Sequence, residues 1–267
     1  MYKLDFNIIS LITKTILRSK IGKYYDPNFY KHSKKYTLDQ IITDLILFLK
    51  RGTSWRDHCG TVCWNTLFMH YQRFTKENIF KKCYDIIINK YSTQNKSQCI
   101  IVDSSFIGNK NGKNKIGRNK YFKNKNCNKL SILCDENGFP FSIIIKEGNI
   151  NDAKLFISHK RHLHRINKNK TQKYVLADAG YDSSKVKKII TDNKLIPIIS
   201  QNKRNTKDKS KIIKLNKEHK KIYKKRIKVE NVFCILKKTK RIQNRYDSYL
   251  SSYLGFLYLL LIVRVCK

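Results

Sequence analysis

The spacing of apolar residues changes near residue 96, and this change constrains the fold more than any other feature of the chain. Before it, apolar residues recur three or four positions apart, as on one face of a helix. After it, short apolar runs rich in β-branched residues stand between polar breaks and are too short to be helices. We therefore expect a small helical domain over residues 1–95 and an α/β domain over residues 96–267.

The helical part has its clearest element after Tyr36. Thr37 and Gln40 have the spacing of a capping box, and the apolar residues that follow keep helical spacing up to Gly52. Shorter patterns over residues 64–74 and 77–91 predict two further helices.

The second part opens with three predicted strands. Residues 99–107 form an apolar, β-branched run, and residues 129–134 and 139–145 flank the sequence Asp-Glu-Asn-Gly, which is typical of a hairpin turn. Strands that follow one another in this way pair as an antiparallel meander. Residues 108–129 are rich in Gly, Asn and Lys, so we expect an exposed basic loop there.

Strands and helices alternate in the remainder of the chain. The expected elements are a helix over residues 152–164, a strand over 173–178, a helix over 183–193, a strand over 195–200, a lysine-rich stretch over 201–221, and a long helix from about 215 to 240. This alternation predicts a mixed sheet covered by helices.

The charge of the chain points to a polyanionic partner. Lys and Arg number 57 against 19 Asp and Glu, a formal net charge of +38, and the basic residues run from Lys3 to Lys267 instead of forming a tail. We expect nucleic acid as the partner.

Cysteine usage and apolar segments bear on location. The eight cysteines lack the paired spacing of zinc sites, and no signal peptide is evident. The apolar residues 255–265 are too few to span a bilayer and include Arg264. We expect a protein that is not secreted, has no membrane partner and lies inside the cell with the DNA, in a bacterial cytoplasm, a nucleus or a viral factory.

Three carboxylates stand where they can share a site. At about 100° per residue, Tyr223, Arg226, Glu230 and Lys237 fall on one face of the predicted long helix. Asp103 lies on the first predicted strand and Asp178 at the end of a later one, where side chains of α/β sheets commonly meet ligands.

The alternative is a purely structural role for each residue. Glu230 alone would be a surface partner of Arg226, and each aspartate alone a turn or cap residue. Together, three clustered carboxylates repel one another unless a cation lies among them. Two Mg²⁺ ions about 3.5–4 Å apart, bound by such oxygens, activate the attacking oxygen and stabilise the leaving one in phosphoryl transfer.

At this point the sequence resembles a known family, the Asp-Asp-Glu (DDE) transposases of bacterial insertion sequences, families four and five. Their signature of Tyr, two residues, Arg, three residues, Glu, six residues, Lys is met by Tyr223, Arg226, Glu230 and Lys237. Upstream, IVDSSFI, the segment GRNKYFKNKNCNKLSILCDENGFPFSI, GNINDAKLF and LADAGYDS are similar to the family's other blocks. YTLDQIITDLILFLKRGTSWRDHCG is similar to the helical domain found before that core.

The resemblance implies a fold, a reaction and a site. The fold is RNase H-like (retroviral-integrase-like), with a mixed sheet preceded by a small helical domain that binds DNA ends. Asp103, Asp178 and Glu230 are the catalytic metal ligands, for two Mg²⁺ ions that Mn²⁺ can replace. Arg226 and Lys237 contact phosphates, and Tyr223 positions or stacks on DNA. A homodimer would hydrolyse a phosphodiester at each element end and join the freed 3′-hydroxyl to target DNA.

Several nearby residues are weighed and set aside. Asp182 suits the start of a helix better than the triad, and Asp152 suits a helix N-cap. For Trp55, Arg56 and Asp57, a buried Trp beside a structural Arg–Asp pair is favoured over recognition of DNA ends.

A zinc site at His159, His162 and His164 is disfavoured, because no second pair of ligands has suitable spacing.

Two other functions compete with the transposase interpretation. A transposase-derived protein that binds DNA without cleaving it is disfavoured by the complete triad. A related metal-dependent nuclease without strand transfer is disfavoured by the Tyr-Arg-Glu-Lys signature.

Overall fold

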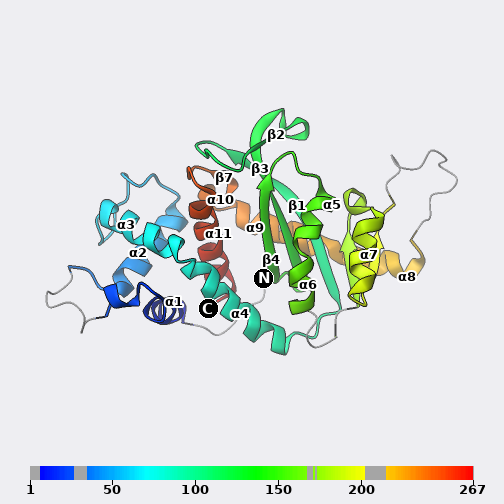
Figure 1. The fold of residues 1–267 in the computed structure, drawn as a ribbon, viewed down its shortest axis with the longest axis horizontal. Helices are drawn as coiled ribbons and strands as arrows, with labels where there is room; N and C mark the ends of the chain where they lie inside the picture. Colours follow the sequence, from blue (N-terminus) through cyan, green and yellow to red (C-terminus); the bar gives the residue numbers. More distant parts are fainter. Residues whose placement is uncertain (1–6, 27–34, 167–170, 172, 202–214, 267) are drawn as a thin grey trace. The chain divides into compact units, whose positions relative to one another are not determined.

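The computed structural model describes residues 7–26, 35–166, 171, 173–201 and 215–266 (Figure 1). The chain divides into two compact units. The sheet unit contains residues 91–109 and 115–235, and the helical unit contains residues 3–90, 110–114 and 236–267. Residues 236–267 thus group with the helical residues, whereas the sequence pattern had placed them with the α/β domain.

The sheet unit is built on a mixed sheet. Strands β1 (Cys99–Asn109), β3 (Lys125–Asp135) and β4 (Pro140–Glu147) pair antiparallel in the meander that the sequence predicted. Strands β5 (Tyr174–Ala177) and β6 (Ile196–Ile199) continue the sheet on the other side of β1, each parallel to its neighbour. The strand order is β4-β3-β1-β5-β6, with the short β2 (Gly117–Asn119) paired to the beginning of β3.

The turn between β3 and β4 has a local cause. Gly138 has φ +77°, a left-handed conformation that glycine adopts without strain. The buried Asp135 carboxylate accepts the backbone amides of Asn137, at 2.9 Å, and Phe139, at 2.8 Å. It also accepts the hydroxyl of Tyr91 at 2.5 Å. The hairpin expected from Asp-Glu-Asn-Gly is confirmed.

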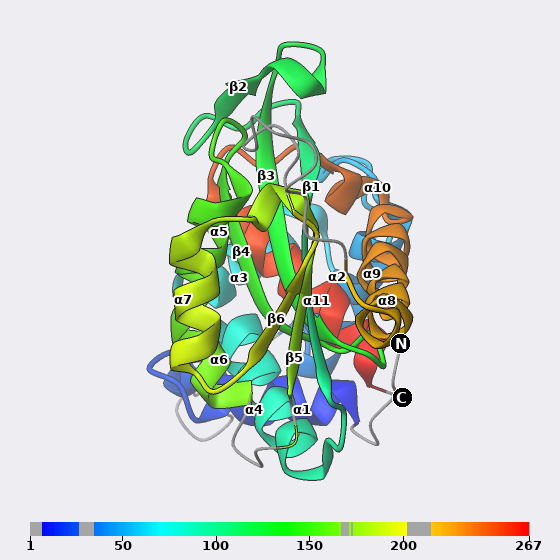
Figure 2. The same ribbon diagram turned by 90° about the vertical axis from the view of Figure 1, so that its right-hand side faces the viewer.

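Helices cover both faces of this sheet. In Figure 2, α5 (Asp152–Ser158), α6 (Lys160–Ile166) and α7 (Ser184–Asp192) lie on one face, and α8 (Lys217–Tyr223) and α9 (Ile227–Lys237) lie on the other. Along α9, Val229, Val232, Phe233 and Leu236 are buried, so this helix turns its apolar side inward.

The prediction of an exposed loop over residues 108–129 is wrong in part. Strand β3 already begins at Lys125, and residues 127–129 are buried. The reason is tertiary: the Asn128 amide donates to the carbonyls of Lys115, at 2.5 Å, and Lys146, at 3.3 Å, so a polar residue fits inside the sheet. Of the lysine-rich stretch 201–221, residues 202–214 lie outside the described residues.

Two expected helices are interrupted. The one predicted over residues 152–164 ends at Ser158 and resumes at Lys160, and the ring of the intervening His159 is buried with hydrogen bonds to Ser142 and Ser131. The long helix expected up to residue 240 contains a 3-10 turn, η5 (Lys224–Arg226), between α8 and α9. From β1 to α9 the order of the longer strands and helices is otherwise as predicted, whereas the short β2 was not predicted.

The helical unit packs around its last helix. Its main elements are α1 (Ile8–Leu17), α2 (Leu38–Arg51), α3 (Trp64–Lys76), most of α4 (Ile79–Gln94), α10 (Lys240–Gln243), β7 (Asn244–Arg245) and α11 (Leu250–Val265). The capping box of Thr37 and Gln40 is present, and Gly52 ends α2 with φ +66°.

Helix α11 approaches α3 closely. The ring of Phe256 stacks on Tyr71 with centroids 4.1 Å apart. A Cβ at Gly255 would lie 2.5 Å from Thr75 Cγ2, so only glycine allows this distance between the helices. Among the described residues, no helix is long and apolar enough to cross a membrane.

Candidate active site

Asp103 and Asp178 lie at the same level of two neighbouring parallel strands. Asp103 is on β1, and Asp178 directly follows β5. The register pairs Ile101 with Leu176, and the second residue after each of these is Asp103 or Asp178. Asp178 is fixed locally as the cap of the 3-10 turn η3 (Ala179–Tyr181), where it accepts the amide of Gly180 at 2.9 Å.

The Arg226 guanidinium joins two of the three predicted carboxylates. Its Nη1 lies 2.7 Å from Asp103 Oδ2, and its Nη2 lies 3.1 Å from Glu230 Oε1. Asp103 and Arg226 are 123 residues apart in sequence, so the first contact is tertiary, whereas the second spans one turn of α9. The side chains of Asp103 and Arg226 are 18% and 20% exposed, while that of Glu230 is 50% exposed.

The other two residues of the predicted signature lie at different distances from this contact. The guanidinium carbon of Arg226 is 6.0 Å from the centre of the Tyr223 ring, within cation–π range. Lys237, the last residue of α9, is half-buried and is grouped with the helical unit. The structure therefore brings together Asp103, Tyr223, Arg226 and Glu230 by direct contact.

The electrostatics place Asp178 beside this group. Burial raises the pKa of Asp103, and the charge of Asp178 raises it further, against the lowering effects of the Ser104 amide and Arg226. Burial lowers the pKa of Arg226, but the charges of Asp103 and Asp178 raise it to a net value above the ordinary one. Asp103 and Asp178 thus repel one another, and Arg226 compensates part of that repulsion.

A fourth carboxylate lies next to the site, and the sequence analysis assigned it wrongly. The N-cap of α5 is Asn151, whose side chain accepts the amide of Lys154 at 2.9 Å, and not Asp152. Asp152 instead accepts the hydroxyl of Ser104, the residue after Asp103, and lies 2.8 Å from Lys129 Nζ.

Asp152 and Asp178 also flank the same glycine. A Cβ at Gly180 would lie 3.1 Å from Asp178 Oδ1 and 3.3 Å from Asp152 Oδ2. The available sequence signal was the Asn before Asp152, because Asn is an equally good cap and leaves the aspartate free for a tertiary contact.

The residues that the sequence placed outside the triad have mostly structural contacts. The cap of α7 is Ser183, while Asp182 pairs with Lys187 at 2.6 Å. Trp55 packs among aromatic side chains but is half-buried instead of buried. The expected Arg–Asp pair is wrong: Asp57 accepts the hydroxyl of Ser54 at 2.6 Å, and no Arg56–Asp57 pair occurs among the described residues.

His159 uses both ring nitrogens on serines, and burial lowers its pKa to about 3. The His164 side chain lies outside the described residues.

The donor chemistry of the site fits a hard divalent cation. Asp103, Asp178 and Glu230 offer carboxylate oxygens, and the pKa of Asp103 is raised first by burial and then by the charge of Asp178, both of which a bound cation would offset. In the described part of the chain, no three His, Cys, Asp or Glu side chains are close enough to hold one ion, and Arg226 contacts both Asp103 and Glu230.

Comparison with known proteins gives a family and a fold. A family model described as the transposase DDE domain matches residues 94–265. A cryo-EM structure of the piggyBac transposase synaptic complex with hairpin DNA is similar with a TM-score of 0.55 and 11% identity, over 98% of this chain and 74% of that chain. This similarity shows the RNase H-like fold.

Two further comparisons add less. A crystal structure of the Mos1 mariner paired-end complex with Mn has a TM-score of 0.28 and 10% identity, over 88% of this chain and 86% of that chain, a similarity too low to carry an argument. No curated protein matches the sequence.

Proposed function

Because this chain belongs to the transposase DDE domain family, it is an enzyme that cleaves DNA and transfers DNA strands, and we propose that Asp103, Asp178 and Glu230 are its catalytic residues. The observation that carries the proposal is the contact of one guanidinium, that of Arg226, with Asp103 and Glu230, beside Asp178. A helix cap or a turn would not explain why a residue 123 positions away places its guanidinium against Asp103, in the middle of β1.

The three carboxylates would hold two Mg²⁺ ions, for which Mn²⁺ can substitute. When bound, the ions supply the Lewis acidity that activates water and stabilises the leaving oxygen of the phosphodiester. Asp103 and Asp178 are suited to hold them because β1 and the cap of η3 fix both backbones. Glu230 is half-exposed and is free to turn toward either neighbour.

The basic residues of α9 and η5 would hold the DNA. Arg226 would contact a phosphate near the cleaved bond when it is not paired with Asp103, and its planar donors suit a bidentate contact. Lys237 would contact a phosphate further along the strand, and Tyr223 would stack on or position a nucleotide. These four signature residues support membership of insertion-sequence families four and five.

The reaction would follow from these positions. Water hydrolyses a phosphodiester at each element end, and the freed 3′-hydroxyl then attacks target DNA in line, without a covalent enzyme intermediate. Two ends must be held together, so we propose a homodimer on DNA. The helical residues 1–95 would recognise the ends, and the protein would lie wherever the DNA lies.

The test is cleavage of DNA that carries the element's ends, taken from the sequence that flanks the gene. Wild-type chain with Mg²⁺ should nick at the ends, and Asp103→Asn, Asp178→Asn and Glu230→Gln should each abolish nicking while DNA binding persists. Asp182→Asn is the matched control, because Asp182 lies in the same motif but pairs with Lys187, and it should still nick. Full activity of a triad variant would exclude that residue.

One alternative remains testable in the same assay. A descendant that binds DNA without cleaving it would bind the ends but show no nicking by the wild-type chain with Mg²⁺ or Mn²⁺.

A further inference from the structure

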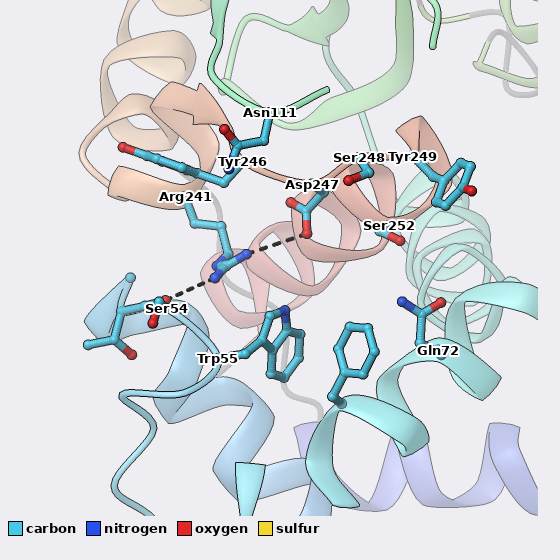
Figure 3. A pocket seen from close by; sticks show the side chains of 13 residues that line it. Ser54, Trp55, Gln72, Asn111, Arg241, Tyr246, Asp247, Ser248, Tyr249 and Ser252 are labelled. Carbon is cyan, nitrogen blue, oxygen red and sulfur yellow. Dashed lines mark hydrogen bonds and ion pairs between the residues drawn. The ribbon is translucent and has the colours of Figure 1, made fainter. Parts of the chain in front are cut away.

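A cavity of about 480 Å³ opens in the helical unit (Figure 3). Its volume lies in the range of about 300–1,000 Å³ that small-ligand sites occupy. Its walls come from the segment after α2, from α3, from the loop after β1 and from the segment that leads into α11. The residues that carry the argument are Thr53, Trp55, Arg241, Tyr246, Asp247 and Tyr249.

Aromatic side chains form one wall and the rim. The Trp55 ring is held in place by stacking on Phe48, with centroids 4.1 Å apart, and by an edge contact with Phe68 at 5.1 Å. Tyr246 and Tyr249 are 44% and 63% exposed, and in Figure 3 they lie on either side of Asp247. A planar ligand can therefore enter past tyrosines and meet a fixed indole.

The floor is a buried ion pair with unused hydrogen-bonding capacity. Arg241 Nη1 lies 3.4 Å from Asp247 Oδ1, and Nη2 donates to the Thr53 carbonyl at 2.9 Å. The two side chains are 5% and 7% exposed. Within the described residues, Asp247 Oδ2, Thr53 Oγ1 and Arg241 Nε are buried without a hydrogen-bond partner. Unpaired buried polar atoms destabilise a fold, so a ligand that pairs with them gains affinity.

The chemistry of these atoms selects the ligand. At the floor, Asp247 Oδ2 accepts N–H groups and Arg241 Nε donates to an acceptor atom, and the aromatic wall favours a flat ring. Because the chain has a net charge of +38 and acts on DNA, the flat rings available to it are nucleobases. Adenine, cytosine and guanine carry an exocyclic amino group, whereas thymine does not.

We propose that this cavity binds one unpaired nucleobase that carries an exocyclic amino group. Asp247 Oδ2 accepts the amino hydrogen, Trp55 contacts the ring, and Tyr249 covers it from the rim. The inference rests on the proposed function, because it takes DNA as the substrate. It adds a base-recognition site in a unit other than the one that holds Asp103.

The experiment uses Trp55 as its own reporter. Trp64→Phe leaves Trp55 as the single tryptophan of the full-length chain. This chain is titrated, at one salt concentration, with duplexes of identical sequence that carry one bulged A, C, G or T or no bulge. Bulged A, C or G should bind about tenfold more tightly than the unbulged duplex and quench Trp55 fluorescence, because one base–aromatic contact contributes about that much. Bulged T should bind less tightly than the other three.

Variants separate the cavity from general DNA affinity. Tyr249→Leu, at an exposed rim residue, should remove most of the preference for the bulge, whereas Tyr24→Leu, an exposed tyrosine of the same unit that does not line the cavity, should keep it. Asp247→Asn should remove the difference between thymine and the other bases. Since it alters a buried ion pair, circular dichroism must first show that it is folded.

The outcomes distinguish this inference from the proposed function. Equal binding of bulged and unbulged duplexes by the wild-type cavity overturns the inference and leaves the transposase assignment intact. Equal affinity for bulged T and bulged A overturns amino recognition by Asp247. Failure to bind any DNA at low salt overturns the DNA-binding function from which both proposals start.

Discussion

Replacing Arg226 by Met should destabilise the sheet unit through Asp103 and not through Glu230. At effective dielectric constants near 20, opposite charges about 4 Å apart attract by about 4 kcal/mol. Removing one partner of a buried pair costs about 3–5 kcal/mol. Because Asp103 and Arg226 are 18% and 20% exposed, solvent screens part of this, and we expect a loss of about 2 kcal/mol. The pair with the half-exposed Glu230 contributes about 0.3–0.5 kcal/mol.

The loss should depend on pH with a definite sign. The folded-state pKa of Asp103 is raised, by burial first, so the cost of its ionised form is absent below the ordinary aspartate pKa of about 3.9 and fully present above the raised value. Arg226→Met removes a lowering influence and raises this pKa further. The difference in the free energy of unfolding between variant and wild type should therefore shrink as the pH falls from 7.5 to 4.5, toward the raised pKa of Asp103.

Amide hydrogen exchange measured peptide by peptide is the suitable assay, because it reports the sheet unit separately from the helical unit. After correction for intrinsic rates, a loss of about 2 kcal/mol appears as roughly thirtyfold faster exchange in β1. Glu230→Gln is the control and should change exchange in β1 by no more than about twofold. Equal effects of the two substitutions, or an Arg226→Met effect that is the same at both pH values, would refute the reasoning.

Two further predictions concern packing and charge. Gly255→Ala should lower the free energy of unfolding by about 2 kcal/mol, because the added methyl would lie 2.5 Å from Thr75 Cγ2. Thermal denaturation measures this loss, and it should show no such loss for Ser251→Ala, at an exposed position of the same helix. Lys129→Met should cost about 2 kcal/mol by leaving Asp152 without its cation, and the double variant with Asp152→Asn should recover most of it in urea denaturation; strictly additive losses would speak against a coupled pair.

Elements with local causes were predictable from the sequence. The capping box at Thr37 and the hairpin turn at Gly138 depend on residues a few positions apart, so their patterns are readable without the fold. The contacts of His159 were not, because its partners are the hydroxyls of Ser131 and Ser142 on two strands. The buried Asn128 is a similar case. The composition of the segment around it predicts a loop, but its side chain donates to carbonyls distant in sequence and Asn128 lies within a strand.

The sequence indicated which residues belong to the candidate site but not which contacts they make. Their positions on a predicted strand, at a strand end and on a helix face pointed to Asp103, Asp178 and Glu230, and Arg226 contacts the first and the last of them. The sequence pattern made Arg226 a helical neighbour of Glu230. That predicts the contact of Arg226 with Glu230, which is the weaker one, but not its contact with Asp103. Spacing along a helix carries no information about a partner 123 residues away, and for the same reason the contacts of Asp152 with Ser104 and Lys129 were missed.

The contacts of Arg226 imply a competition that can be measured without catalysis. Its guanidinium contacts the Asp103 carboxylate that we propose as an ion ligand, so we expect ion binding to compete with this contact. Arg226→Met should therefore bind Mn²⁺ more tightly than wild type in the absence of DNA, by about tenfold if the displaced contact contributes about 1.4 kcal/mol. Electron paramagnetic resonance of free Mn²⁺ measures this directly, and Lys225→Met, whose lysine pairs with Glu136, is a matched control. Weaker Mn²⁺ binding by Arg226→Met would mean that Arg226 positions the carboxylates for the ion instead of competing with it.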